Sequence, residues 1–314
     1  MLGFRLVVRL EAERRYRRQD GPLFQLDTVS REERLRKLMH AVAQTQAAQA
    51  AGIADAIIRV QTGPHPQQLL SALPTTPIAW YLERKQWHRF TKVERHRRQR
   101  FEYNLHPAPR IAVLMAGFEN TDTTQCYPEG YCEHMESFRP EAIAGSVPML
   151  RRLATSVFTC GTKLRHLKRP IIVFTGLPFE ERTLLTDEDR SLFWRAFGLP
   201  VTERYLGFGL ETLAKECEAH DGLHLNLDTA IFQTFFDGKH PELIVTSLDH
   251  LSHPVLRLAT GLSADITFQP CRCGQPGPRL MKLGQIPHAS WQTDVMPRKP
   301  PVPVPALAAA VGGG

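Results

Sequence analysis

Four residues in the second half of the chain have the types and spacing of metal ligands. Cys217 and His224 are separated by six residues, and Cys271 and Cys273 form a Cys-x-Cys pair. Thiolates and imidazoles are the usual ligands of tetrahedral zinc, and four of them without a carboxylate predict a closed, structural site. By spacing alone, four unrelated buried residues remain an alternative interpretation, and His220 competes with His224 as the imidazole ligand.

A second, smaller group of soft ligands lies earlier in the chain. Cys126, Cys132 and His134 are close in sequence, with three glutamates between and after them. Such a group could bind a metal with a carboxylate as its fourth ligand, or Cys132 and His134 could act as nucleophile and base. The simpler interpretation, which we favour, is a surface loop with incidental cysteines, because catalytic dyads are assembled in space rather than by local spacing.

The bulk properties restrict the class of protein. The chain has 314 residues, a formal net charge of +7 and six cysteines. This length allows one large domain or two small ones, and six cysteines are too few for a disulfide scaffold of this size. No apolar run reaches the ~20 residues that a membrane helix needs, and the N-terminus lacks the apolar core of a signal peptide. We therefore expect a soluble, cytoplasmic protein without a membrane span.

The segment 83–101 (ERKQWHRFTKVERHRRQRF) is strongly basic, with aromatic residues between the charges. This combination is typical of nucleic-acid-binding surfaces. The alternative is a solvated helix whose long Arg and Lys side chains cover apolar surface. No recognised nucleic-acid-binding module surrounds the segment, so the sequence favours the solvated helix.

Hydrophobic patterns predict the elements that must position these groups. The β-branched run 170–176 is typical of a parallel strand that is buried on both faces. Acidic residues after Thr186 and a Gly-Leu-Pro stop at Gly198 delimit a helix, and residues 201–205 follow as a strand. The segment 170–206 therefore predicts a strand–helix–strand unit of an open α/β sheet.

Weaker patterns complete the expected layout. Residues 110–116 predict a buried strand and residues 140–154 a helix, while 222–233 and 241–248 alternate apolar and polar residues as antiparallel strands do. Together these patterns predict three parts: a helical, basic N-terminal region (1–110), an α/β domain with the zinc site (111–283), and a proline- and glycine-rich tail that we expect to be disordered (284–314).

Six segments between residues 139 and 283 carry a family resemblance, and they follow one another in the same order as in that family. They are PEAIAGSVPMLRRLA (140–154), IVFTGLPFEERTL (172–184), RAFGLPVTERYLG (195–207), ECEAHDGLHL (216–225), ELIVTSLDHLSHPVLRLATG (242–261) and CRCGQPGPRL (271–280). This stretch, a little under half of the chain, resembles the phenylacetate–CoA ligase branch of the adenylate-forming (ANL) superfamily. The resemblance implies an α/β fold: a reduced ANL-like large domain with a mixed or parallel sheet flanked by helices, a zinc-bearing β subregion and no C-terminal lysine domain.

The resemblance also implies ligands. Some members of this branch carry zinc at the positions of Cys217, His224, Cys271 and Cys273, so it selects His224 over His220. Family enzymes activate a carboxylate with ATP and magnesium and pass the acyl group to coenzyme A. The corresponding nucleotide-binding positions here are Gly176, Tyr205, Glu211 and Arg257.

Several family groups are replaced, however. No Ser/Thr/Gly-rich phosphate loop is found in the sequence, and the family's Gly-x-Glu-Pro is Gly176-Leu-Pro-Phe. Glu211 stands two residues after the position of the glutamate that helps to hold magnesium. The aspartate that holds the ribose is replaced by Leu262. These losses leave little of the positioned charge on which adenylyl transfer depends.

The sequence therefore predicts a degenerate adenylate-forming protein with structural zinc, which serves as a binding or scaffold partner. A protein partner, an acyl carrier or a carboxylic acid would be its ligand. One alternative is an active ATP-dependent carboxylate–CoA ligase that is completed by another chain. The other is a nucleic-acid-binding protein that uses the segment 83–101.

Overall fold

The computed structural model describes residues 28–77, 100–101, 103, 108–128, 132–162, 164–176, 184–236, 240–248 and 254–286. The expected tail from residue 287 and nearly all of the basic segment 83–101 lie outside the described residues. Contacts divide the chain into two units. The described part of unit 1 falls within Thr91–Leu227 and Ala264–Gln285, and that of unit 2 within Asp27–Phe90, Asp228–Ser263 and Ile286–Gly314. The boundaries predicted at residues 110 and 283 stay a prediction.

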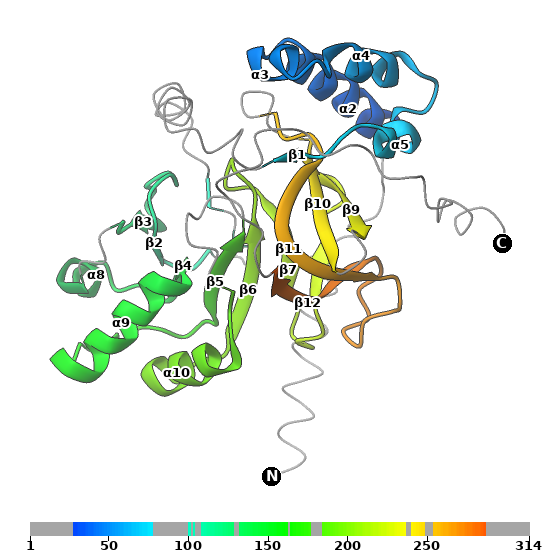
Figure 1. Cartoon of the computed structure of the whole chain (residues 1–314). Coiled ribbons are helices and arrows are strands. Elements are labelled where there is room, and N and C mark those ends of the chain that lie inside the picture. Colours follow the sequence, from blue (N-terminus) through cyan, green and yellow to red (C-terminus); the bar gives the residue numbers. More distant parts are fainter. Residues whose placement is uncertain are drawn as a thin grey trace. The chain divides into compact units, whose positions relative to one another are not determined.

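Unit 1 contains a parallel run of strands in the order β3-β2-β4-β5-β6 (Figure 1). Their bounds are Thr124–Cys126 (β3), Ile111–Leu114 (β2), Ala142–Ser146 (β4), Ile171–Gly176 (β5) and Val201–Leu206 (β6). Every residue of β2, β4 and β5 is buried, because strands inside a parallel sheet are covered on both faces. The strand predictions for 110–116, 170–176 and 201–205 are confirmed.

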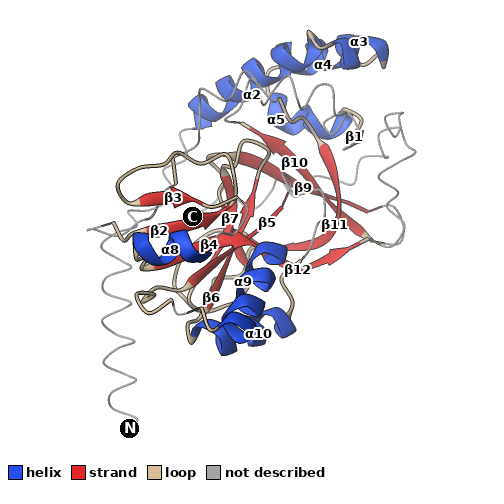
Figure 2. Cartoon of the chain, turned by 90° about the vertical axis from the view of Figure 1, so that its left-hand side faces the viewer, coloured by secondary structure: helices blue, strands red, loops and turns tan. Residues whose placement is uncertain are grey.

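Helices α8 (Cys132–Phe138), α9 (Val147–Cys160) and α10 (Asp187–Phe197) connect these strands. Figure 2 shows α9 and α10 side by side, and their apolar faces enter one core with the strands, through residues such as Leu150, Val173 and Phe193. As predicted, α10 begins after Thr186, which forms a capping box with Asp189, and it ends at Gly198 in the left-handed region.

The helix predicted over 140–154 is wrong in its first half. Residues 142–146 form β4, which pairs with both β2 and β5, and α9 begins only at Val147. Short apolar runs fit a buried strand as well as a helix. The sheet decides between them here, because β4 fills the space between two neighbouring strands.

Three antiparallel strands extend the sheet of unit 1 and make it mixed. They are β7 (Thr212–Glu216), β8 (Leu223–Leu225) and β12 (Arg279–Gln285), in the order β6-β7-β8-β12. The strand predicted over 222–233 is therefore two separate strands, β8 and, in unit 2, β9. This mixed α/β sheet confirms the predicted fold class in its coarse form.

Unit 2 contains helices and strands with both antiparallel and parallel pairing. The helices are α2 (Thr28–Ala43), α3 (Gln46–Ala50), α4 (Ala54–Thr62), α5 (Pro66–Leu69) and the 3₁₀ turn η1 (Leu70–Ala72). The strands are β1 (Thr76–Pro77), β9 (Ala230–Phe236), β10 (Pro241–Ser247) and β11 (Leu258–Thr267), the last of which continues into unit 1 from Ala264. β10 pairs antiparallel with β9 and β11, which confirms the strand predicted over 241–248. One apolar core joins the helices to Ile231, Leu248 and Leu256.

Candidate functional site

The four predicted metal ligands come together in unit 1. The ligand atoms of Cys217, His224, Cys271 and Cys273 all lie within 4.8 Å of one another. The two sulfurs of Cys217 and Cys271 are 3.6 Å apart, and Cys273 Sγ is 3.4 Å from His224 Nε2. Ligands bound to one tetrahedral zinc ion lie about 3.8 Å apart for two sulfurs and about 3.6 Å for sulfur and nitrogen, given the usual bond lengths. The cluster thus has the dimensions of a zinc site, and zinc itself stays a prediction.

Two tight turns bring these ligands into place. The first turn follows β7 at Cys217, where His220 N donates to Cys217 O at 3.0 Å, and it returns the chain into β8. Gly222 in this turn has φ +82°, and a Cβ there would lie 2.6 Å from Leu280 O, so only glycine fits. The second turn closes with Gly274 N donating to Cys271 O at 2.9 Å. Gly274 has φ +79°, so each turn contains a glycine in the left-handed region.

Burial is the main cause of the pKa shifts at Cys217 and His224. It raises the pKa of the Cys217 thiol to about 12, so this thiol keeps its proton at neutral pH unless a cation is bound. Burial, together with the charges of Arg279 and Lys215, lowers the pKa of His224 to about 4. His224 is therefore a neutral imidazole at pH 7, which is the form that binds metals. Its Nδ1 has no hydrogen-bond partner among the described residues.

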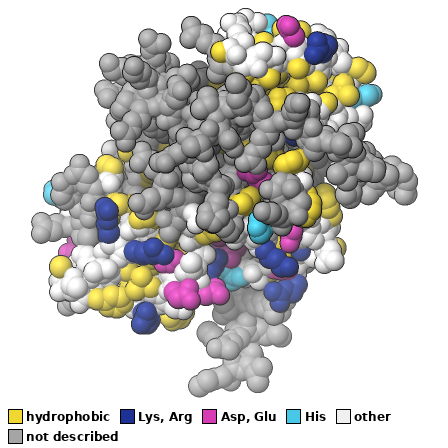
Figure 3. Space-filling view, viewed as in Figure 1, with side chains coloured by type: hydrophobic (Ala, Val, Ile, Leu, Met, Phe, Trp, Pro, Cys, Tyr) yellow, Lys and Arg dark blue, Asp and Glu magenta, His cyan; other side chains and the backbone are white. Residues whose placement is uncertain are grey.

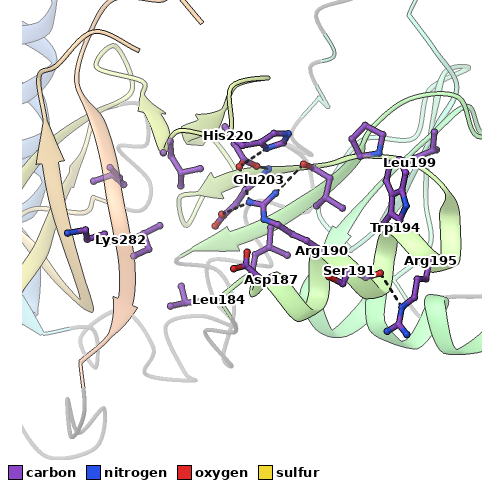
Figure 4. Close-up of a pocket in the computed structure, with 18 residues that line it drawn as sticks. Leu184, Asp187, Arg190, Ser191, Trp194, Arg195, Leu199, Glu203, His220 and Lys282 are labelled. Atoms are coloured by element: carbon purple, nitrogen blue, oxygen red, sulfur yellow. Dashed lines mark hydrogen bonds and ion pairs between the residues drawn. The ribbon is translucent and has the colours of Figure 1, made fainter. Parts of the chain in front are cut away.

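His220 lies outside the cluster. Its Nδ1 is 2.9 Å from Glu216 Oε1, and the ring lies along a pocket (Figure 4). The structure therefore brings His224 rather than His220 to the three cysteines. The second predicted group is not assembled in the part of the chain that the structure describes: Cys126 Sγ donates to Phe118 O at 3.4 Å, His134 is exposed, and the Cys132 side chain lies outside the described residues.

The predicted nucleotide-binding residues are mostly buried. In unit 1, Gly176 ends β5 with φ +122°, and a Cβ there would lie 2.3 Å from Leu206 O. Tyr205 is fully buried in β6, and Glu211 is 5% exposed. The Glu211 carboxylate lies against Gly207 of its own turn, where a Cβ would come within 2.1 Å of Oε1. Tyr205 and Glu211 therefore lie on either side of a turn that is closed by the hydrogen bond from Gly207 N to Glu211 O.

Arg257, the remaining nucleotide candidate, belongs to unit 2. It is 3% exposed, and its Nη1 donates to Gln233 Oε1 at 2.8 Å. Burial lowers the pKa of Arg257 to about 10, so the side chain remains charged at neutral pH. Burying a cation whose hydrogen-bond partner is neutral costs free energy. Arg257 is therefore a candidate binding group for an anion in unit 2.

A pocket that the sequence analysis missed lies beside α10 in unit 1, with a volume of about 730 Å³ (Figure 4). Leucines from several segments and Trp194, which is 57% exposed, form apolar walls. Arg190 Nη2 in the pocket is 2.9 Å from Glu216 Oε1. Glu203 accepts from Thr175 Oγ1 at 2.7 Å, and burial raises the pKa of its carboxyl. The pocket thus combines apolar walls with charged side chains that are paired with one another or with neighbouring residues.

One sequence signal could have indicated this pocket. Charged residues, Ser191 and Trp194 recur on α10 at helical spacing, at positions 187, 190, 191, 194 and 195, all of which line the pocket. On the face drawn in Figure 3, the described Lys and Arg side chains lie among Asp and Glu rather than in one basic patch. None of the described helices has the length and apolar character to cross a bilayer.

Comparison with known proteins identifies the fold. No family model and no curated protein matches the chain. Among solved structures, it is similar to 2-hydroxyisobutyryl-CoA ligase in complex with 2-HIB-AMP and CoA in the thioesterification state, with TM-score 0.53 and 13% identity over 83% of this chain and 69% of that one. This chain has the fold of an adenylate-forming acyl-CoA ligase. The resemblance stated from the sequence is thereby confirmed for the fold.

Other states of the same ligase give a consistent result. In the postadenylation state with 2-HIB-AMP, the TM-score is 0.53 at 14% identity, over 84% of this chain and 68% of the ligase. In an open conformation the match has a TM-score of 0.44 and covers 46% of the ligase chain, against 68% in the postadenylation state. This chain therefore shares the fold of part of the ligase chain, not of its whole length.

Proposed function

We propose that this chain is a degenerate member of the phenylacetate–CoA ligase-like branch of the adenylate-forming superfamily, with a structural zinc ion, and that it acts as a binding or scaffold partner. The shared fold and the six ordered segments support its place in this branch. The four assembled Cys and His ligands support the zinc. The altered nucleotide positions support a loss of independent adenylation.

The conformation of Glu211 is the observation that carries this proposal. Glu211 is the residue nearest in sequence to the family's magnesium-binding glutamate. Gly207 N donates to Glu211 O at 2.9 Å, which closes the turn, and the buried carboxylate lies against Gly207. A carboxylate that coordinates magnesium must present its oxygens to the ion. Leu262, at the position of the ribose-binding aspartate, is buried and apolar, so it offers no hydrogen bond to a ribose.

Zinc would act here as a structural ion. Bound to Cys217, His224, Cys271 and Cys273, it would hold the turn after β7 to the turn before β12, and it would supply folding energy rather than chemistry. The donor set fits, because three thiols and one neutral imidazole suit zinc and leave no position for a substrate.

The pocket beside α10 is where we expect a small ligand. Its volume of about 730 Å³ lies within the ~300–1,000 Å³ typical of small-molecule sites. Apolar walls with a few polar groups suit the hydrocarbon part of a carboxylic acid. An acyl carrier or another protein partner could present such a group.

An active ligase completed by another chain is the second candidate function, and Arg257 favours it. This buried arginine matches the family's arginine and has a neutral hydrogen-bond partner in Gln233. Its charge would suit an anionic ligand. ATP, magnesium and coenzyme A would then be its cofactors.

Pyrophosphate release separates the two functions. We expect the purified chain, incubated with ATP, magnesium and a panel of aliphatic and aromatic carboxylic acids, to release no pyrophosphate above a control without acid. The physical reason is the loss of positioned charge around the phosphates. Acid-dependent release that Arg257→Ala abolishes, while Arg59→Ala at an exposed position of the same unit preserves it, would establish the ligase instead.

A further inference from the structure

Arg279 lies between the two turns that carry the predicted zinc ligands. It is the first residue of β12, where it pairs with His224 of β8 in antiparallel register. Its side chain is 3% exposed. Nη1 is 2.8 Å from Asp221 Oδ2 and also donates to the Asp221 carbonyl oxygen, and Nη2 donates to Gln269 O at 3.1 Å.

These contacts connect two separate parts of the metal centre. Asp221 belongs to the turn between Cys217 and His224, and Gln269 stands two residues before Cys271. One planar guanidinium therefore holds both ligand-bearing segments. The guanidinium presents several N–H donors in a fixed plane, so it holds two partners at a defined separation, which the single ammonium of a lysine does less well.

The charges around the centre are complementary to a loaded site. A divalent zinc ion with three thiolates and a neutral imidazole carries one net negative charge, which is costly to bury without compensation. Arg279 acts electrostatically on Cys217, Cys271 and His224. Asp221, the acidic group beside it, is also 3.8 Å from the exposed Arg272. Lys215 also acts electrostatically on His224, so the charged side chains around the centre are positive on balance and oppose the negative charge of a loaded site.

We propose that Arg279 is a positioning residue of the metal centre: it holds the two ligand-bearing turns together and offsets the negative charge of the loaded site, and so it sets the affinity for zinc. This inference rests on the structural zinc proposed above. Residues that support metal ligands in this way typically contribute about 10–100-fold to metal affinity.

The test is a competition titration of zinc between the full chain and a chromogenic chelator of known affinity. Arg279→Met is expected to weaken zinc binding about 10–100-fold. Arg279→Lys, which keeps the charge and loses the fork, should show a smaller loss. Lys282→Met removes one positive charge from the same strand at an exposed position, so its zinc affinity should equal that of the wild-type chain.

The outcomes separate this inference from the zinc proposal. A wild-type chain that binds no zinc would overturn both. A wild-type chain that binds zinc, with equal affinity in Arg279→Met, would overturn the role of Arg279 alone. If Arg279→Met does not fold, wild-type zinc affinity in Arg279→Lys overturns it. A purely structural role would lower the melting temperature equally in wild-type and Cys271→Ser backgrounds, whereas we expect a smaller change in the background without the site.

Discussion

Cys271→Ser is expected to abolish stoichiometric zinc binding and to lower the free energy of unfolding by about 3–5 kcal/mol. Serine nearly preserves the size of the side chain, but its hydroxyl cannot replace a thiolate as a zinc ligand. The remaining three ligands then leave the turns at Cys217 and Cys273 without a common ion. Zinc per chain, measured by elemental mass spectrometry, and the urea midpoint of unfolding should fall together.

The matched control for this prediction is Cys160→Ser. Cys160 is an exposed cysteine at the end of α9, outside the cluster, so this change should alter neither zinc content nor stability. Unchanged zinc stoichiometry and an unchanged unfolding midpoint in Cys271→Ser would contradict the structural zinc site.

Asp189→Ala is expected to destabilise unit 1 by about 2–3 kcal/mol. The buried Asp189 carboxylate accepts two hydrogen bonds from Arg151, from Nε at 2.6 Å and from Nη2 at 2.9 Å. It also accepts from the backbone N–H of Thr186 at 3.2 Å within the capping box of α10. The substitution removes the side-chain half of the capping box and the link between α9 and α10 together, while Thr186 Oγ1 still accepts from the backbone N–H of residue 189. Chemical unfolding of the purified chain measures the loss.

The same carboxylate predicts a dependence on pH. Burial opposes ionisation of Asp189, but the hydrogen bonds from Arg151 and Thr186 outweigh it and lower the pKa of the carboxyl. Its contribution is therefore complete above the unfolded pKa of about 4 and is lost as the pH falls through the lower folded pKa. Stability should fall less steeply below pH 4 in Asp189→Asn than in the wild-type chain.

Glu188→Ala provides the comparison for Asp189. Glu188 is an exposed acidic residue in the same first turn of α10, so its removal should cost only the few tenths of a kcal/mol of an interaction with the helix dipole. An equal effect of the two substitutions would show that the buried contacts of Asp189 contribute nothing.

The sequence predicted those parts of the fold whose signals are local. The strand–helix–strand unit over 170–206 follows from a β-branched run, a cap at Thr186 and a stop at Gly198, and all three lie in short segments. β4 was missed because five small or apolar residues fit a helix equally well until β2 and β5 pair with them. The predicted strand 222–233 merged β8 and β9, since alternation alone does not reveal the turn between them.

The candidate sites show the same difference between local signals, which the sequence reveals, and long-range contacts, which it does not. Residue types and the Cys-x-Cys spacing predicted a metal site, but spacing left His220 and His224 as rivals. The choice depends on the turn, which directs His220 to Glu216 and leaves His224 beside Cys273. The pattern on α10 could have indicated one wall of the pocket beside this helix. The pocket as a whole could not be predicted, because its other walls come from β6, β7, β8 and β12 in distant parts of the sequence.

Calorimetric titration of ATP and of AMP into the zinc-quantified chain tests the central claim most directly, because it does not require knowledge of the acid. The account predicts no heat of binding at millimolar nucleotide, since Glu211 is buried against its own turn and Leu262 stands where the family resemblance implies a ribose-binding aspartate. Saturable binding of ATP that Glu211→Ala or Arg257→Ala abolishes would contradict it and would show that the nucleotide site is intact.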